Sequence, residues 1–128
     1  MTQMARWLPL FWALAFWGAS ASVLVLSLLP VEQLPPQVLD WWDKAQHAFG
    51  FAVLTVLGWL AYPQRLRVLL PGLLVFGAFI EVAQHATGWR YGDVLDWLAD
   101  AVGVVLGAVC MAVWVRFSGP RARSHTTL

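Results

Sequence analysis

Charged residues are scarce in this chain of 128 residues. Lysine, arginine, aspartate and glutamate together make up 12% of the sequence, about half of the roughly 25% that is typical of soluble domains. A soluble protein of this size needs a polar surface, because roughly a third or more of its residues face water. Eight basic and seven acidic residues cannot supply that surface. The composition therefore excludes a soluble enzyme, a nucleic-acid-binding protein and a disordered chain.

Cysteine is almost absent, which excludes two further kinds of site. A single cysteine, Cys110, excludes both an internal disulfide framework and a metal site made of several cysteines. The chain also lacks a compact metal signature, such as two histidines flanking a glutamate on one helix. We therefore assign no metal ligand set and no cofactor from the sequence.

The chain is rich in long apolar segments. A transmembrane helix needs about 20 mostly apolar residues, and four segments separated by proline and glycine approach or exceed that length. The predicted spans are residues 7–29, 45–62, 68–86 and 94–117, followed by a polar tail at 118–128. The first segment also imitates a cleaved signal peptide at Ala19-Ser20-Ala21. Because it stays apolar to Leu29, we favour an uncleaved anchor.

The basic residues are distributed unevenly along the chain. Six of the eight precede the first span, join the second to the third, or lie at and beyond the end of the fourth. They are Arg6, Arg65, Arg67, Arg116, Arg121 and Arg123. All seven acidic residues fall at the other ends of the spans, together with Lys44 and Arg90. By the positive-inside rule, the sequence predicts one all-α domain, an integral membrane bundle of four transmembrane helices with both termini cytoplasmic.

Polar side chains gather at the predicted outer ends of three spans. Residues three or four apart share a helix face, so each set forms one stripe. The sets are Asp43, Lys44, His47 and Phe51 at or just before the start of the second span, Glu81 and Gln84 near the end of the third, Arg90 in the following loop, and Asp93, Asp96 and Asp100 at or just before the start of the fourth. The sequence therefore predicts a polar pocket within the membrane that opens outward. Gly103 and Gly107 continue the last stripe, and their spacing is typical of close helix packing.

Simpler roles exist for several of these residues. Asp43 and Asp93 suit helix N-terminal caps, and His47 suits a hydrogen-bonded histidine inside a bundle. Glu81 and Asp100 lie about 10 Å below the outer boundary, at 1.5 Å per residue, which is too deep for capping. An isolated charge at that depth costs a few kcal/mol. A structural pair of Glu81 with Arg90 or with Lys44 is therefore an alternative to a ligand-binding role.

The order of these residues resembles the VanZ-like family. The motifs are Asp43-Lys44-x-x-His47-x-x-x-Phe51, Glu81-x-x-Gln84 and Arg90-x-x-Asp93-x-x-Asp96-x-x-x-Asp100-x-x-Gly103-x-x-x-Gly107. The resemblance implies a small, multi-pass protein of the bacterial inner membrane, with the polar cluster on the periplasmic or extracellular side. The founding member is an accessory factor in resistance to the glycopeptide teicoplanin, and the resemblance implies no established reaction. Asp100 stands where the family usually carries Asn, and Phe51 where it often carries Tyr.

These observations lead to a first hypothesis of binding. Lys44, His47 and Arg90 would meet the headgroup of a membrane lipid, of a lipid-linked envelope intermediate, or of a glycopeptide-type antibiotic amphiphile. This gives an accessory role in resistance or in the cell envelope. A homodimer is compatible with the pattern, and nucleic acid is not an expected partner.

Two other functions stay open at this point. The first is an intramembrane hydrolase or transferase for a lipid-linked substrate, with His47 as base or ligand and a divalent cation held by Glu81, Asp96 and Asp100. The second is a proton-coupled transporter that uses the buried acids. The sequence does not decide whether the protein is an enzyme.

Overall fold

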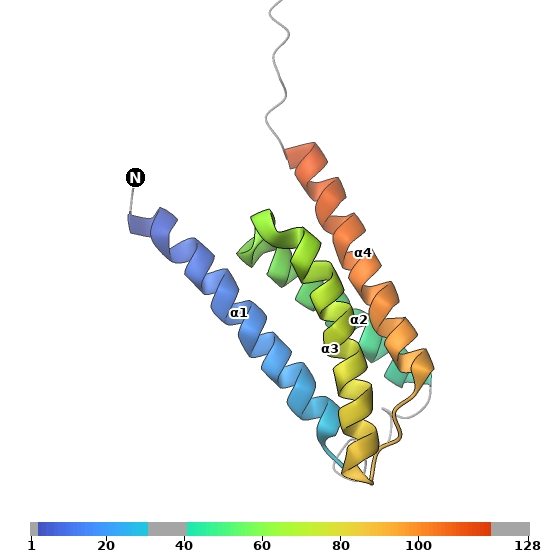
Figure 1. Ribbon diagram of the computed structural model, residues 1–128. Helices are drawn as coiled ribbons and strands as arrows, with labels where there is room; N and C mark the ends of the chain where they lie inside the picture. Colours follow the sequence, from blue (N-terminus) through green and yellow to red (C-terminus); the bar gives the residue numbers. More distant parts are fainter. Residues whose placement is uncertain (1–2, 31–40, 119–128) are drawn as a thin grey trace, which may run out of the picture.

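The computed structural model describes residues 3–30 and 41–118, and the backbone there is helical with short connections. The elements are α1 (Gln3–Leu28), α2 (Trp41–Ala61), a short 3-10 helix η3 (Pro63–Arg65), α3 (Leu66–Thr87) and α4 (Val94–Ser118) (Figure 1). No strand occurs in the described residues. The prediction of an all-α chain with four long helices is confirmed. Arg121, Arg123 and the tail at 119–128 lie outside the described residues.

The helices end where the sequence places chain breakers. Pro63 begins η3 and separates α2 from α3. Gly88 follows α3 with φ of 80°, a left-handed conformation that ends helices and that glycine adopts without strain. Pro71 lies inside α3 without ending it, as prolines in membrane helices commonly do.

Three helical segments are long and apolar enough to cross a membrane. They are Leu8–Leu28, Pro63–Thr87 and Val94–Ser118. Many of their large apolar side chains are exposed, including Phe11, Val75 and Val105, which suits a lipid rather than an aqueous surrounding. The protein is therefore a membrane protein. α2 does not meet the same criterion, because its first two turns carry four polar residues, so the fourth span stays a prediction.

The four helices place the described acidic residues and most of the arginines at opposite ends, with Lys44 and Arg90 at the acidic end. The last turn of α1, the first turn of α2, the last turn of α3 and the first turn of α4 gather at the lower end in Figure 1. The η3 connection, with Arg65, lies at the other end, as does the end of α4 with Arg116 (Figure 1). This polarity agrees with the predicted arrangement of charges. The side of the membrane that each end faces stays a prediction.

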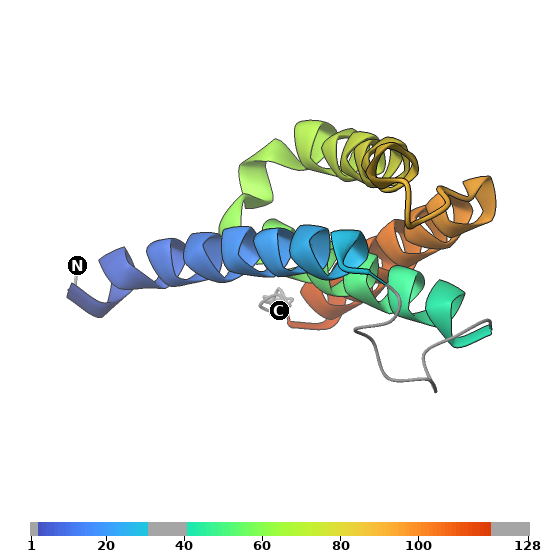
Figure 2. The same ribbon diagram turned by 90° about the horizontal axis from the view of Figure 1, so that it is seen from below.

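α2 is the central helix of the bundle. It packs against α1 and most extensively against α4, and Figure 2 shows α2 running next to both helices. Two buried glycines of α4 allow this approach: a Cβ on Gly103 would collide with the carbonyl oxygen of Ala48, and one on Gly107 would lie 2.7 Å from that of Ala52. The α2 and α4 backbones are thus nearly in contact, which brings the polar stripes of the two helices together.

Candidate functional site

The first polar contact between α2 and α4 is a lysine shared by two aspartates. Lys44 Nζ lies 2.7 Å from Asp96 Oδ1 and 3.1 Å from Asp93 Oδ2. The side chain of Asp96 is only 10% exposed, whereas those of Lys44 and Asp93 are nearly half exposed. The partly exposed Lys44 ammonium therefore balances the charge of the buried Asp96 carboxylate.

Asp93 caps the N-terminus of α4. Its Oδ1 accepts a hydrogen bond of 2.9 Å from the backbone N–H of Leu95, the usual geometry of an N-terminal cap. That hydrogen bond, followed by the one from Lys44, lowers the pKa of Asp93 below its ordinary value. The capping interpretation of Asp93 therefore holds, and the residue pairs with Lys44 as well.

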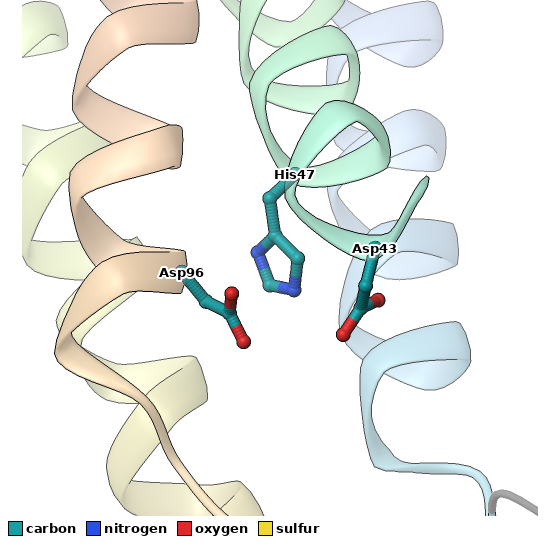
Figure 3. Close-up of side chains that lie close together, drawn as sticks. All are labelled: Asp43, His47 and Asp96. Carbon is teal, nitrogen blue, oxygen red and sulfur yellow. The ribbon is translucent and has the colours of Figure 1, made fainter. Parts of the chain in front are cut away.

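One turn deeper, a histidine of α2 faces an aspartate of α4. His47 Nδ1 lies 2.9 Å from Asp100 Oδ1, and the Asp100 side chain is completely buried. The ring of His47 also lies between the carboxylates of Asp43 and Asp96 (Figure 3). Because a buried carboxylate without a partner is costly, His47 is the residue that makes Asp100 tolerable at this depth.

Glu81 of α3 does not form the ion pair considered from the sequence. Among the described residues it pairs with neither Arg90 nor Lys44; its Oε2 accepts a 2.7 Å hydrogen bond from the backbone N–H of Asp93. Its other oxygen, Oε1, is buried with no hydrogen-bond partner in the described structure. Glu81 therefore ties α3 to the start of α4 and presents one free acceptor.

The C-terminus of α1 is capped by side chains from the end of α3 and the following loop. Gln84 Nε2 donates to Ser27 O at 3.0 Å, and Trp89 Nε1 donates to Leu28 O at 3.1 Å. Arg90 Nε donates to Leu29 O, also at 3.1 Å. The last carbonyls of a helix have no partner within it, and a cation there is favoured by the helix dipole. Gln84 and Arg90 therefore hold α1 in place.

A hollow of about 290 Å³ opens between these capped carbonyls and the start of α2. One wall is apolar, with Val23 and Leu26 of α1 and Phe51 of α2. The predicted polar residues that line it are Asp43, His47, Gln84 and Arg90. Gln46, Gly50 and Ser27 also line it and were not predicted. Gln46 lies beside His47, whereas nothing in the apolar α1 sequence indicates a polar role for Ser27.

The remaining predicted residues lie outside this hollow. Glu81 and Asp93 line a second depression of about 380 Å³ between α3 and α4. Lys44, Asp96 and Asp100 line neither of the two hollows. The tightly packed α2–α4 contact thus separates residues for which the sequence predicts a single pocket, although His47 still joins the two parts through Asp100.

A comparison with known protein families identifies the family of the chain. The VanZ/LLP1 family model matches residues 4–115. The chain belongs to the VanZ/LLP1 family. The family resemblance that the sequence shows from Asp43 to Gly107 is confirmed. The match also extends over α1, and Gln84 and Arg90 cap the C-terminus of that helix. No curated protein and no solved structure matches the chain.

The structure shows the surroundings of Phe51 and Asp100, the two residues at which we expect, from the sequence, a departure from the family's pattern. Phe51 is 1% exposed and packs against Phe76, with ring centroids 6.0 Å apart, so its side chain belongs to the apolar core beside the hollow. Asp100 places a carboxylate where its partner, His47, can act as a donor. A neutral amide at position 100 could also accept that hydrogen bond, but it would carry no charge.

Proposed function

We propose that this VanZ/LLP1-family protein binds the polar headgroup of a membrane amphiphile in the hollow between α1, α2 and α3. The observation that carries the proposal is the composition of the walls: apolar side chains of α1 face His47, Gln84 and Arg90 across about 290 Å³. That volume lies at the low end of the range for small-molecule sites. It suits one headgroup, with the acyl chains left in the surrounding lipid.

Arg90 is the residue best suited to recognise an anionic headgroup. Its Nε is used by Leu29 O, and the terminal nitrogens of its guanidinium form no hydrogen bond or salt bridge within the part of the chain that the structure describes. Guanidinium groups bind phosphate and carboxylate oxygens through such paired N–H donors. His47 and Gln46 add further hydrogen-bonding groups on the facing wall.

The placement in the membrane is part of the same proposal. The four helices would all cross a bacterial inner membrane, with Arg65, Arg67 and Arg116 on the cytoplasmic side and the hollow at the outer leaflet. A lipid, a lipid-linked envelope intermediate or a glycopeptide-type amphiphile would then reach it from the outside. An accessory role in the envelope or in antibiotic resistance follows from binding any of these. The hydrolase, transferase and transporter alternatives stay predictions.

Lipid analysis of the purified protein tests this function. Arg90→Gln keeps an amide donor for Leu29 O and removes the positive charge from the hollow. Arg67→Gln removes the same charge from an exposed site at the opposite end of the bundle, so it is the matched control. We expect anionic lipids to co-purify with the wild type and with Arg67→Gln, and to be depleted severalfold in Arg90→Gln by mass spectrometry of the extracts. Equal lipid profiles for all three proteins would refute the binding role of the hollow.

A further inference from the structure

Three buried oxygen atoms at the polar end of the bundle have no hydrogen-bond partner in the described structure. They are Glu81 Oε1, Gln84 Oε1 and Asp100 Oδ2. All three are acceptors, and buried acceptors without a partner are rare because each costs about 1–3 kcal/mol. Whatever satisfies them must be a donor or a cation.

Side-chain rotation does not solve this problem, because each group is already held by its other polar atom. Glu81 Oε2 accepts the Asp93 N–H, and Asp100 Oδ1 faces His47 Nδ1. Gln84 Nε2 donates to Ser27 O, and a flipped amide would set two oxygens against each other. The hydrogen bonds of the other polar atoms therefore fix the directions of the three unpaired oxygens. Asp100 Oδ2 faces α3 at Gly77, one turn before Glu81, where a Cβ would lie 2.6 Å from it.

Neither Lys44 nor Arg90 pairs with Glu81 or Asp100 in the described residues. Lys44 binds Asp93 and Asp96, and Arg90 donates its Nε to a carbonyl of α1. Within the described residues, the carboxyl groups of Glu81 and Asp100 thus have only His47 as a nearby basic group, and His47 pairs with Asp100. The arrangement places two carboxyl groups and one imidazole close together, with no lysine or arginine of the described residues paired to them.

We propose that His47, Glu81 and Asp100 bind a divalent cation. One ligand atom from each of these residues lies within 4.8 Å of the other two. Tetrahedral ligands, each about 2.1 Å from one ion, lie about 3.4 Å apart, so the three side chains need to draw together by no more than about 1.4 Å to complete the site. Coordination by His47 Nδ1 would replace its 2.9 Å hydrogen bond to Asp100 Oδ1, and the released proton would leave with solvent. One imidazole with two carboxylates favours Zn²⁺ or Mn²⁺ over Ca²⁺.

A second trio at the same end is less suited to a cation. Ligand atoms of Asp43, His47 and Asp96 also lie within 4.8 Å of one another (Figure 3). However, Asp96 Oδ1 already contacts the ammonium of Lys44 at 2.7 Å, and that positive charge would repel a metal ion. The two trios share His47, so they compete for one ion, and the Glu81–Asp100 pair provides the free carboxylate oxygens.

Metal titration of the full chain in detergent tests this proposal, which goes beyond the headgroup hollow and does not rest on it. The chelator-treated protein would be titrated with Zn²⁺ by calorimetry and with Mn²⁺ by electron paramagnetic resonance. We expect one ion per chain, with affinity reduced about 100-fold or more in Glu81→Gln and in Asp100→Asn, because loss of an outer-shell partner alone typically costs about 10–100-fold and these two residues would ligate the ion directly. Asp43→Asn, from the competing trio, distinguishes the two trios and should lose clearly less affinity than either of these variants.

Several results would overturn the assignment. One such result is a wild type that binds neither ion stoichiometrically. Another is Glu81→Gln and Asp100→Asn variants that bind as tightly as the wild type does. Loss of binding in Asp43→Asn alone would move the site to the other trio. Should the two variants fail to fold, as judged by circular dichroism, the wild type still decides the question: pulsed resonance of bound Mn²⁺ should show coupling to an imidazole nitrogen, and its absence would exclude His47 as a ligand.

Discussion

The close approach of α2 and α4 gives the sharpest prediction, because it depends on the absence of one carbon atom. Replacing Gly103 by alanine introduces a Cβ that collides with the carbonyl oxygen of Ala48 and lies 2.9 Å from its carbonyl carbon and 3.0 Å from its Cα. All three atoms belong to the backbone, so no side chain can rotate away. The two helices must separate to accommodate the methyl group.

The expected loss of stability follows from two opposing effects. Alanine in place of a helical glycine stabilises by roughly 0.5–1 kcal/mol, whereas overpacking a close contact costs about 1–3 kcal/mol. Because the obstacle at Gly103 is backbone, we expect the upper end of that cost and a net destabilisation of about 2 kcal/mol, or about 30-fold in the folding equilibrium. Gly18→Ala is the matched control, since a Cβ there meets nothing within 4 Å and only the stabilising effect remains.

Reversible unfolding in mixed micelles, followed by far-ultraviolet circular dichroism, measures both variants. The two substitutions should change the free energy of unfolding in opposite directions. Gly103→Ala should also weaken the His47–Asp100 contact, because His47 precedes Ala48 on α2 and Asp100 lies one turn before Gly103 on α4. If Gly103→Ala were as stable as Gly18→Ala, the α2–α4 packing described above would be incorrect.

Three further predictions concern the polar end and its orientation. Gln84→Ala should destabilise the fold by about 1–2 kcal/mol in the same unfolding assay, because a carbonyl of α1 loses its donor; an unchanged midpoint would contradict the capping role. Lys44→Met should destabilise by leaving the buried Asp96 unpaired, and adding Asp96→Asn should recover part of that loss, whereas additive losses would argue against the pair. Cysteine labelling tests the orientation, in a background without the native cysteine. A cysteine that replaces the exposed Tyr91 should react with an impermeant maleimide in intact cells, whereas a cysteine that replaces the exposed Gln64 should react only after permeabilisation. The reverse pattern would invert the proposed orientation.

Much of the fold could be read from local sequence because helix formation in this chain is a local matter. Apolar runs predict the helices, and Pro63 and Gly88 end two of them by their own backbone geometry. The i, i+3, i+4 spacing likewise predicts which side chains share a face, since it depends only on helical periodicity. The sequence therefore determines the four helices and their polar ends without reference to their packing.

The partners of those side chains were decided by the tertiary structure alone. Lys44 binds Asp93 and Asp96 rather than Glu81, and Glu81 accepts from a backbone N–H that no composition argument identifies. Gln84 caps a helix whose own sequence is almost entirely apolar. Periodicity gives the face of each helix but not the rotation and separation of two helices, which are set by packing, here by the glycines of α4 against the backbone of α2. Those distances decide which acid is neutralised by a neighbour and which is left to hold a ligand.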